Sequence, residues 1–303
     1  MIQSPLNYTG GKYKLLPQLL PHFPTEIHTF VDLFCGGCNV GINVTAEKYI
    51  YSDTNEQLLY LYQTFKNLGK ELVFQWIYQI IEKYDLSMVS RYGYAHYGCD
   101  SAKGLSSYNK SRYLKLRADF NTKTPEDYYY YVMLYVIVVY AFNNQIRFNR
   151  KKEFNLPVGK RDFNERMQKK LADFIDVIQR QDATFLCLDF RAFDLSRLRK
   201  DDFVYVDPPY LITCASYNEQ GGWDDGDERA LLDFLDRLSV RGIRFALSNV
   251  LRSKGKENTI LCAWTEKNKR RYRVLPLQYS YANASYHTKD KRNPSEEVLI
   301  INY

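Results

Sequence analysis

Long apolar segments, disulfide-type cysteine spacing and metal-binding clusters are all scarce in this 303-residue sequence. The longest apolar stretch, residues 128–142, is rich in Tyr and shorter than the ~20 residues needed to cross a bilayer. We therefore expect a buried helix there and no membrane association. The first residues contain no basic segment followed by an apolar one, so we expect no signal peptide. No second cysteine pair or histidine cluster completes a zinc site with Cys35 and Cys38. These absences predict a reduced, cytoplasmic protein without a metal ion.

Charge and aromatic content indicate the kind of partner. The chain has 42 Lys and Arg against 35 Asp and Glu, a net charge of +7, and 16% of its residues are aromatic, including 27 Tyr. Phosphates attract Lys and Arg, and nucleic-acid bases stack on aromatic rings. The composition therefore favours a polyanionic partner, although many soluble proteins carry a similar charge.

Strands and helices alternate at both ends of the chain, with a helical block between them. A Tyr-rich middle, roughly 66–180, has helical periodicity, most clearly over 72–84, 111–120 and 127–141. This order predicts a parallel αβα sheet that carries an inserted domain. The expected strands are 29–34, 49–52, 184–188, 203–206, 244–247 and 298–301, and the expected helices beside them are 40–48, 56 onward and 228–238.

The most informative motif is Asp207-Pro208-Pro209-Tyr210. It follows an apolar run typical of a buried strand, so Asp207 stands at a carboxyl end, where ligands bind in open α/β sheets. Each proline lacks an N–H and restricts the residue before it, so the turn is stiff. An acid, a rigid carbonyl and an aromatic ring suit a planar base that bears an amino group. Taken alone, the motif is equally compatible with a strand that simply ends.

Two glycine motifs suggest a nucleoside site. Gly36 and Gly37 follow the strand 29–34, where glycines let backbone approach a ligand closely. Asp53 comes about 20 residues after that strand, a spacing that suits an acid bonded to ribose hydroxyls. Near the N-terminus, Gly11 and Lys12 would place backbone and an ammonium beside an anionic group. An ordinary turn is the alternative for each motif.

A basic, amide-rich block covers residues 142–161. Residues 142–170 hold nine Lys or Arg and three Asp or Glu, so most of the excess positive charge lies here. Asn, Gln and Arg side chains read base edges and grip phosphates. We expect a hairpin with Lys151 and Lys152 at its tip and 147–150 and 154–156 as its arms; a solvated basic loop is the alternative.

In this order, the motifs resemble the Dam-like class of DNA adenine-N6 methyltransferases, in the α-group arrangement. Segments 241–250 and 281–286 are also similar to family segments, so the resemblance covers nearly the whole chain. It implies a Rossmann-like methyltransferase αβα sandwich with an inserted, mainly helical DNA-recognition domain that carries a β-hairpin. Residues 1–65 and 180–303 would form the catalytic domain that binds S-adenosylmethionine, and 66–179 the inserted target-recognition domain.

The resemblance also implies roles for individual residues. Cys38 departs from the family because many relatives have a glycine there, and Gln145 departs because an apolar residue can occupy its position. The implied catalytic residues are Asp207, Pro208 and Tyr210. The implied cofactor residues are Tyr8, Gly11, Lys12, Asp32, Phe34, Gly36, Gly37, Asp53 and Asp207. The implied DNA-binding residues are Phe142 and Asn143 as a wedge in the duplex, Gln145, Arg147 and Pro157 near the bases, Asn149 and Asn155 at the phosphates, and Lys160.

The implied reaction is methyl transfer from S-adenosylmethionine to N6 of adenine in double-stranded DNA, within GATC, on a flipped-out base. The protein would be a monomer, acting either on its own or alongside a cognate restriction endonuclease. Cytosine-N4 DNA methyltransferases use the same kind of motif and reaction but usually have Ser at the position of Asp207. RNA or protein-glutamine methyltransferases do not explain the basic block. A non-catalytic DNA-binding relative would not need the intact motif, and a nicotinamide dehydrogenase would leave both motif and block without a role.

Overall fold

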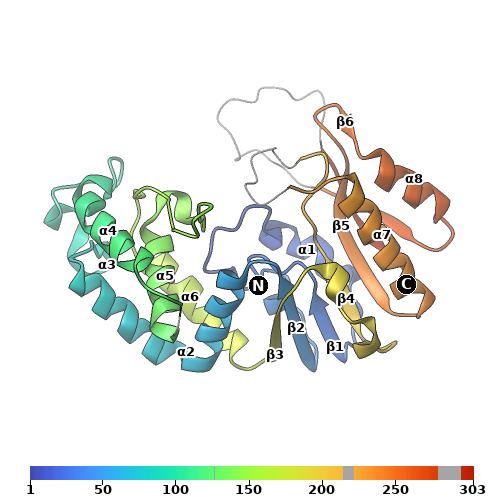
Figure 1. The fold of residues 1–303 in the computed structure, drawn as a ribbon, viewed down its shortest axis with the longest axis horizontal. Coiled ribbons are helices and arrows are strands. Elements are labelled where there is room, and N and C mark those ends of the chain that lie inside the picture. Colours follow the sequence, from blue (N-terminus) through green and yellow to red (C-terminus); the bar gives the residue numbers. More distant parts are fainter. Residues whose placement is uncertain (126, 214–221, 279–294) are drawn as a thin grey trace. The chain divides into compact units, whose positions relative to one another are not determined.

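A mostly parallel β-sheet forms the centre of the fold. The computed structural model describes residues 1–125, 127–213, 222–278 and 295–303. The strand order is β3-β2-β1-β4-β5-β8-β7, with β6 paired to β5. Strands β3, β2, β1, β4 and β5 run parallel to one another, whereas β8 and β7 are antiparallel to their neighbours (Figure 1). The strands are β1 (Thr29–Asp32), β2 (Lys48–Asp53), β3 (Asp182–Cys187), β4 (Phe203–Val206), β5 (Arg244–Ser253), β6 (Lys256–Glu257), β7 (Arg273–Leu277) and β8 (Glu296–Ile301).

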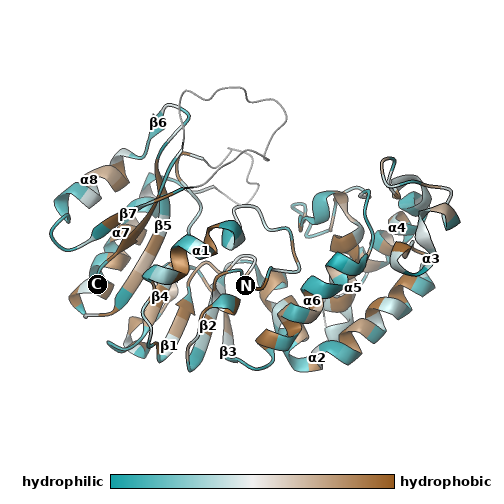
Figure 2. Ribbon diagram, turned by 180° about the vertical axis from the view of Figure 1, so that it is seen from behind, coloured by the Kyte–Doolittle hydropathy of each residue, from teal (hydrophilic) through white to brown (hydrophobic). Residues whose placement is uncertain are grey.

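Helices cover both faces of this sheet, which explains why β4 is buried along its whole length. On one face, α7 (Asp225–Val240) and α8 (Thr259–Lys267) share a core with apolar residues of β1, β4 and β5. On the other face, the short helix α1 (Leu16–Leu19) and its flanking turns precede Phe23, whose ring lies 4.9 Å from the ring of Phe203. In Figure 2 brown segments are prominent along β5, whereas β2 and β3 also carry teal. The predicted α/β fold is confirmed, but the sheet is mostly rather than entirely parallel because β8 and β7 are antiparallel to their neighbours.

The middle of the chain is helical. It contains α2 (Glu56–Lys83), α3 (Val89–His96), α4 (Ser106–Asn121), α5 (Tyr128–Tyr140) and α6 (Glu165–Ile178). Helix α5 is apolar all round and is buried from Tyr130 to Tyr140, as a core helix must be. Across the ranges that the structure describes, no helix combines the length and apolar character that a membrane span requires.

Backbone contacts divide the chain into two compact units, each assembled from separate segments. The helical unit contains residues 1–11, 36–42 and 55–181, and the sheet unit contains 12–35, 43–54 and 182–303. Helix α2 runs without interruption through residue 65 and bends at Gly69, which has a positive φ of 78°.

The prediction of a helix over 40–48 is wrong. Only Gly41–Asn43 form a short 3-10 turn, and β2 already begins at Lys48. The segment contains Gly41 and several β-branched residues, which disfavour a helix, and only four residues separate the turn from the strand. The other expected strands and helices are confirmed with shifts at their ends. The family-like segment 281–286 lies outside the described residues.

Candidate active site

Asp207 is the centre of a polar cluster at the carboxyl end of β4 in the sheet unit. Its Oδ1 lies 2.8 Å from the ammonium of Lys12, and the side chain of Lys12 is only 5% exposed. The hydroxyl of Tyr210 donates to the same oxygen at 3.1 Å. The Lys12 ammonium also lies 4.8 Å from the centre of the Tyr210 ring. Three predicted residues therefore contact one another, and the carboxylate is fixed by two donors.

Burial determines the protonation of this cluster. It raises the pKa of Asp207 above its ordinary value, while the Lys12 ammonium and the Tyr210 hydroxyl oppose the rise by favouring the carboxylate. Burial, followed by the charges of Asp207 and Glu297, raises the pKa of Tyr210 well above its ordinary value. Tyr210 is therefore a phenol, and a hydrogen-bond donor, throughout the neutral range.

Glu297 is a member of the cluster that the sequence reasoning missed. It lies on β8, opposite Val250 of β5, and is 3% exposed. Its Oε1 accepts from the Tyr210 hydroxyl at 3.2 Å and lies 3.9 Å from the Lys12 ammonium. Because β8 is antiparallel to β5, its amino end reaches the same edge as Asp207. The available signal was a pair of acids at the start of an otherwise apolar strand, and the structure shows that the second of them, Glu297, is buried.

Two further predicted acids stand at the same edge of the sheet. Asp32 ends β1 and is 2% exposed, and Asp53 ends β2 and is half-buried. Phe34 follows β1 and packs edge-on against Trp223, with ring centres 5.8 Å apart. Carboxylates at the carboxyl ends of adjacent parallel strands are suitably placed to accept hydrogen bonds from a nucleoside.

In the helical unit, the glycine turn is built around Tyr8. Gly36 has a φ of 42°, and a Cβ on it would come within 2.7 Å of the Tyr8 ring, so only glycine fits. The hydroxyl of Tyr62 donates to the Gly36 carbonyl at 2.8 Å. The N–H of Gly11 donates to the Tyr8 carbonyl at 3.1 Å, which closes the N-terminal turn. Gly37 is similarly close to Tyr8.

Cys38 extends this turn in a conformation that favours glycine. Its φ is 54°, in the left-handed region that non-glycine residues rarely occupy. A glycine, which the family resemblance implies for this position, would adopt this conformation without strain. The cysteine is fully buried, so packing of its side chain offsets part of the backbone cost.

The basic block contains a tight antiparallel turn. Phe148 and Phe154 form an antiparallel bridge, and Lys151 and Lys152 lie in the turn between them. Asn149 builds this turn, since its Oδ1 accepts from the N–H groups of Lys151 and Glu153 at 2.9 and 3.0 Å. Its amide also donates to the Glu153 carboxylate at 2.9 Å. The side chain predicted to contact phosphate is thus engaged in holding the turn.

Helix α4 anchors the second arm of the hairpin. Asn121 bonds both backbone groups of Phe154, donating to its carbonyl at 3.1 Å and accepting from its N–H at 2.9 Å. Tyr113 and Arg117 both donate to the carbonyl of Leu156, at 2.9 and 2.8 Å. The hairpin is therefore fixed to the helical unit through its own backbone groups.

The predicted DNA-binding side chains lie on this block. Phe142 is 48% exposed, and its N–H donates to the Pro157 carbonyl at 2.8 Å. Arg147 is exposed, and its Nε donates to Asn155 at 2.8 Å, so these two side chains form a pair. The positions of the remaining residues are as follows: Asn143 is exposed with a φ of 56°, Gln145 is half-buried, and Pro157 and Lys160 are exposed.

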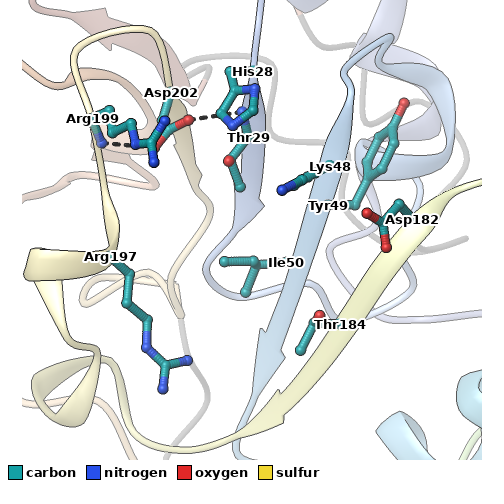
Figure 3. Close-up of a pocket in the computed structure, with 10 residues that line it drawn as sticks. All are labelled: His28, Thr29, Lys48, Tyr49, Ile50, Asp182, Thr184, Arg197, Arg199 and Asp202. Carbon is teal, nitrogen blue, oxygen red and sulfur yellow. Dashed lines mark hydrogen bonds between the residues drawn. The ribbon is translucent and has the colours of Figure 1, made fainter.

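A hollow of about 230 Å³ lies at the opposite edge of the sheet, at the amino ends of β1 to β3 (Figure 3). Its lining mixes Lys48, Arg197 and Arg199 with acids, and Asp202 accepts from the backbone N–H groups of Thr29 and Arg199. It contains none of the predicted site residues. Within the described ranges, His, Cys, Asp and Glu side chains nowhere gather in a group of three that would hold a metal ion.

Comparison with known proteins identifies the family that this fold and site define. Residues 8–283 match the D12 class N6 adenine-specific DNA methyltransferases, so the chain belongs to this family. It is 42% identical over 308 residues to the type II methyltransferase M.FokI of Planomicrobium okeanokoites, and 42% identical over 309 residues to the modification methylase StsI of Streptococcus sanguinis. Both alignments cover the whole chain but 43% of the relative, so the chain spans less than half the length of these two proteins. A DNA adenine methylase of Vibrio cholerae is 27% identical over 249 residues, 80% of each protein. The resemblance drawn from the motifs is confirmed.

Proposed function

We propose that the chain transfers a methyl group from S-adenosylmethionine to N6 of adenine in double-stranded DNA. Family membership supports the reaction class. The observation that carries the proposal is the cluster at the end of β4, where Asp207 is held by Lys12 and Tyr210 beside a buried Pro208. Residues 1–65 and 180–303 would provide catalysis, and 66–179 target recognition.

The residues fit the cofactor by their chemistry. Asp53, at the end of β2, has the position and charge to accept hydrogen bonds from ribose hydroxyls. Asp32 and Phe34 follow β1, where a carboxylate and an aromatic ring suit the charged and planar parts of the molecule. Tyr8, Gly11, Gly36 and Gly37 are assigned to the same cofactor by the family resemblance. When bound, the cofactor supplies an activated methyl group, so the reaction requires no metal ion.

Asp207 and the Pro208 carbonyl would accept the two hydrogens of the adenine amino group. These bonds direct the nitrogen lone pair towards the methyl group, and catalysis comes mainly from positioning and electrostatics. Because burial raises the pKa of Asp207, its carboxylate would be a suitable acceptor for the proton that N6 loses on methylation, and it would not have to remove that proton before attack. The Tyr210 ring would stack on the base.

An adenine inside a duplex cannot reach this cluster, so the base would be flipped out at a cost of a few kcal/mol. Phe142 is the side chain best suited to fill the gap in the duplex, because it is apolar, aromatic and half exposed. Asn143 is exposed beside it. The wedge and the stacking on Tyr210 would offset the cost of flipping.

Sequence recognition would come from the hairpin anchored on α4. Arg147 is exposed on it and has the fork geometry that reads O6 and N7 of guanine. Lys151 and Lys152 at the tip would attract phosphates irrespective of sequence. We propose GATC as the site, on the resemblance of the hairpin to those of GATC-reading relatives, and a monomer that acts alongside a cognate restriction endonuclease.

The test is transfer of labelled methyl from S-adenosylmethionine to duplexes with and without GATC, followed by nucleoside analysis. N6-methyladenine in the GATC duplex alone is the expected result, with Asp207→Ala as the inactive control. Label in both duplexes would support the proposed reaction but reject GATC as the recognition site. Formation of N4-methylcytosine would show that the target base is cytosine and not adenine. Cofactor binding without label in any duplex would indicate a non-catalytic DNA-binding protein.

A further inference from the structure

The hydroxyl of Tyr210 lies between two carboxylates. Its distance to Asp207 Oδ1 is 3.1 Å and its distance to Glu297 Oε1 is 3.2 Å. A phenol carries a single proton, so it donates to one of these oxygens at a time. The raised pKa of Tyr210 keeps that proton in place across the neutral range. The two acceptors therefore compete for the same donor.

This competition matters for the proposed function, on which the inference rests. While Tyr210 donates to Asp207, it occupies part of the oxygen that would receive the adenine amino group. While it donates to Glu297, Asp207 keeps its bond to Lys12 and has more of its accepting capacity available for substrate. The side chain that attracts the tyrosine proton therefore influences how well the catalytic carboxylate can accept.

Glu297 is held firmly enough to play this part. Its strand pairs with β5 on one side and β7 on the other, and the residue is 3% exposed. Its neighbour Glu296 differs in both burial and partner, because it is exposed and forms an ion pair with Arg252 at 2.8 Å. Two adjacent glutamates on one strand thus provide a test residue and a matched control.

We propose that Glu297 is a positioning residue that accepts the Tyr210 hydroxyl proton in place of Asp207 and so leaves more of the Asp207 carboxylate to accept the adenine amino group. It acts through Tyr210. A glutamine at this position still presents an oxygen to the phenol, whereas an alanine does not. Without Tyr210's hydroxyl, the identity of residue 297 no longer matters for the chemical step.

A double-mutant cycle on the purified chain tests this, with kcat and the KM for S-adenosylmethionine measured on a duplex substrate. Glu297→Ala is expected to lower kcat about tenfold or more, the size of one hydrogen bond to a charged group, with little change in KM. Glu297→Gln should stay within about threefold of wild type. In a Tyr210→Phe background, Glu297→Ala should change kcat less than about threefold. Glu296→Gln should leave kcat unchanged.

Two kinetic outcomes would overturn the proposal. One is an equal loss from Glu297→Ala in the tyrosine and phenylalanine backgrounds, which means a merely structural role. The other is a Glu297→Gln variant as impaired as Glu297→Ala, which means that positioning of the hydroxyl does not determine kcat.

Thermal unfolding of the four proteins of the cycle (wild type, Glu297→Ala, Tyr210→Phe and the double variant) gives a readout that does not depend on activity. A non-additive Tm shift of about 2 °C or more supports the shared hydroxyl, and additive shifts refute it. If wild type transfers no methyl, the proposed function fails, and the Tm cycle alone decides the inference.

Discussion

Replacing Asn121 with alanine is expected to release the hairpin from α4 while the rest of the helical unit stays folded. Asn121 bonds both backbone groups of Phe154, and Phe154 is 1% exposed. Leaving a buried donor or acceptor without its partner costs about 1–3 kcal/mol. For two groups, with water entering part of the gap, we expect a loss of about 2–4 kcal/mol, confined to the arms around the turn.

Hydrogen exchange followed by mass spectrometry measures this loss directly. Peptides covering 146–156 should exchange about 30-fold faster or more in Asn121→Ala, because each 1.4 kcal/mol corresponds to a factor of ten. Preference for cognate over random duplex should fall at the same time, since Arg147 lies on the released segment. Binding of S-adenosylmethionine should be unchanged.

Two variants on the same helix serve as controls. Asn121→Asp keeps an acceptor for the Phe154 N–H and should show an intermediate effect. Leu114 is 41% exposed, and Leu114→Ala should leave exchange of the hairpin at the wild-type rate. Wild-type exchange in Asn121→Ala would refute the reasoning, because it would mean that these two bonds do not hold the hairpin.

Three further predictions concern the proposed reaction. Activity should fall as pH decreases through the raised pKa of Asp207, since the protonated acid accepts less well; Lys12→Met removes an interaction that lowers this pKa, so a pH–rate profile should show its acid limb at higher pH. An acid limb moved to lower pH would contradict the assignment. Asp207→Ala should abolish methyl transfer while S-adenosylmethionine binding persists by calorimetry, and retained transfer would show that another group accepts the amino hydrogens. Arg147→Ala should reduce discrimination by about 1–3 kcal/mol, whereas Lys151→Ala should weaken binding to all duplexes and flatten its salt dependence; equal losses on cognate and random DNA for both variants would remove the distinction.

Local patterns were enough to predict most of the sheet. Residues 203–206 form a strand with the predicted bounds because their apolar run is short, β-branched and aromatic, and followed by prolines. The order of strands and helices then predicted a parallel sheet, which holds for β1 to β5 but not for β8, which is antiparallel to β5. The predicted helix over 40–48 is wrong because the prediction rested on the usual strand–turn–helix order, whereas these residues have poor helix propensity.

Non-local contacts were beyond the reach of the sequence. Glu297 joins Lys12 and Tyr210 only because β8 inserts between β5 and β7 as an antiparallel strand, and nothing in its neighbourhood along the chain indicates that pairing. Likewise, the amide of Asn149 is a group that can bind phosphate, but in the structure this side chain stabilises a turn. Residue type predicted the chemistry available, and packing determined which groups use it.

The strand order has a consequence for how the chain is made. Strand β1 lies between β2 and β4, and the carboxylate of Asp202, just before β4, accepts from the N–H of Thr29, 173 residues away in the sequence. During synthesis, β1 and β2 emerge first and must wait for the whole helical segment before β3 and β4 can flank them. Such long-range pairing is slow to form and leaves strand edges exposed meanwhile. Nascent chains that stop before β4 should therefore be prone to aggregation and proteolysis, and the helical segment, which is contiguous in sequence, should acquire structure before the sheet closes.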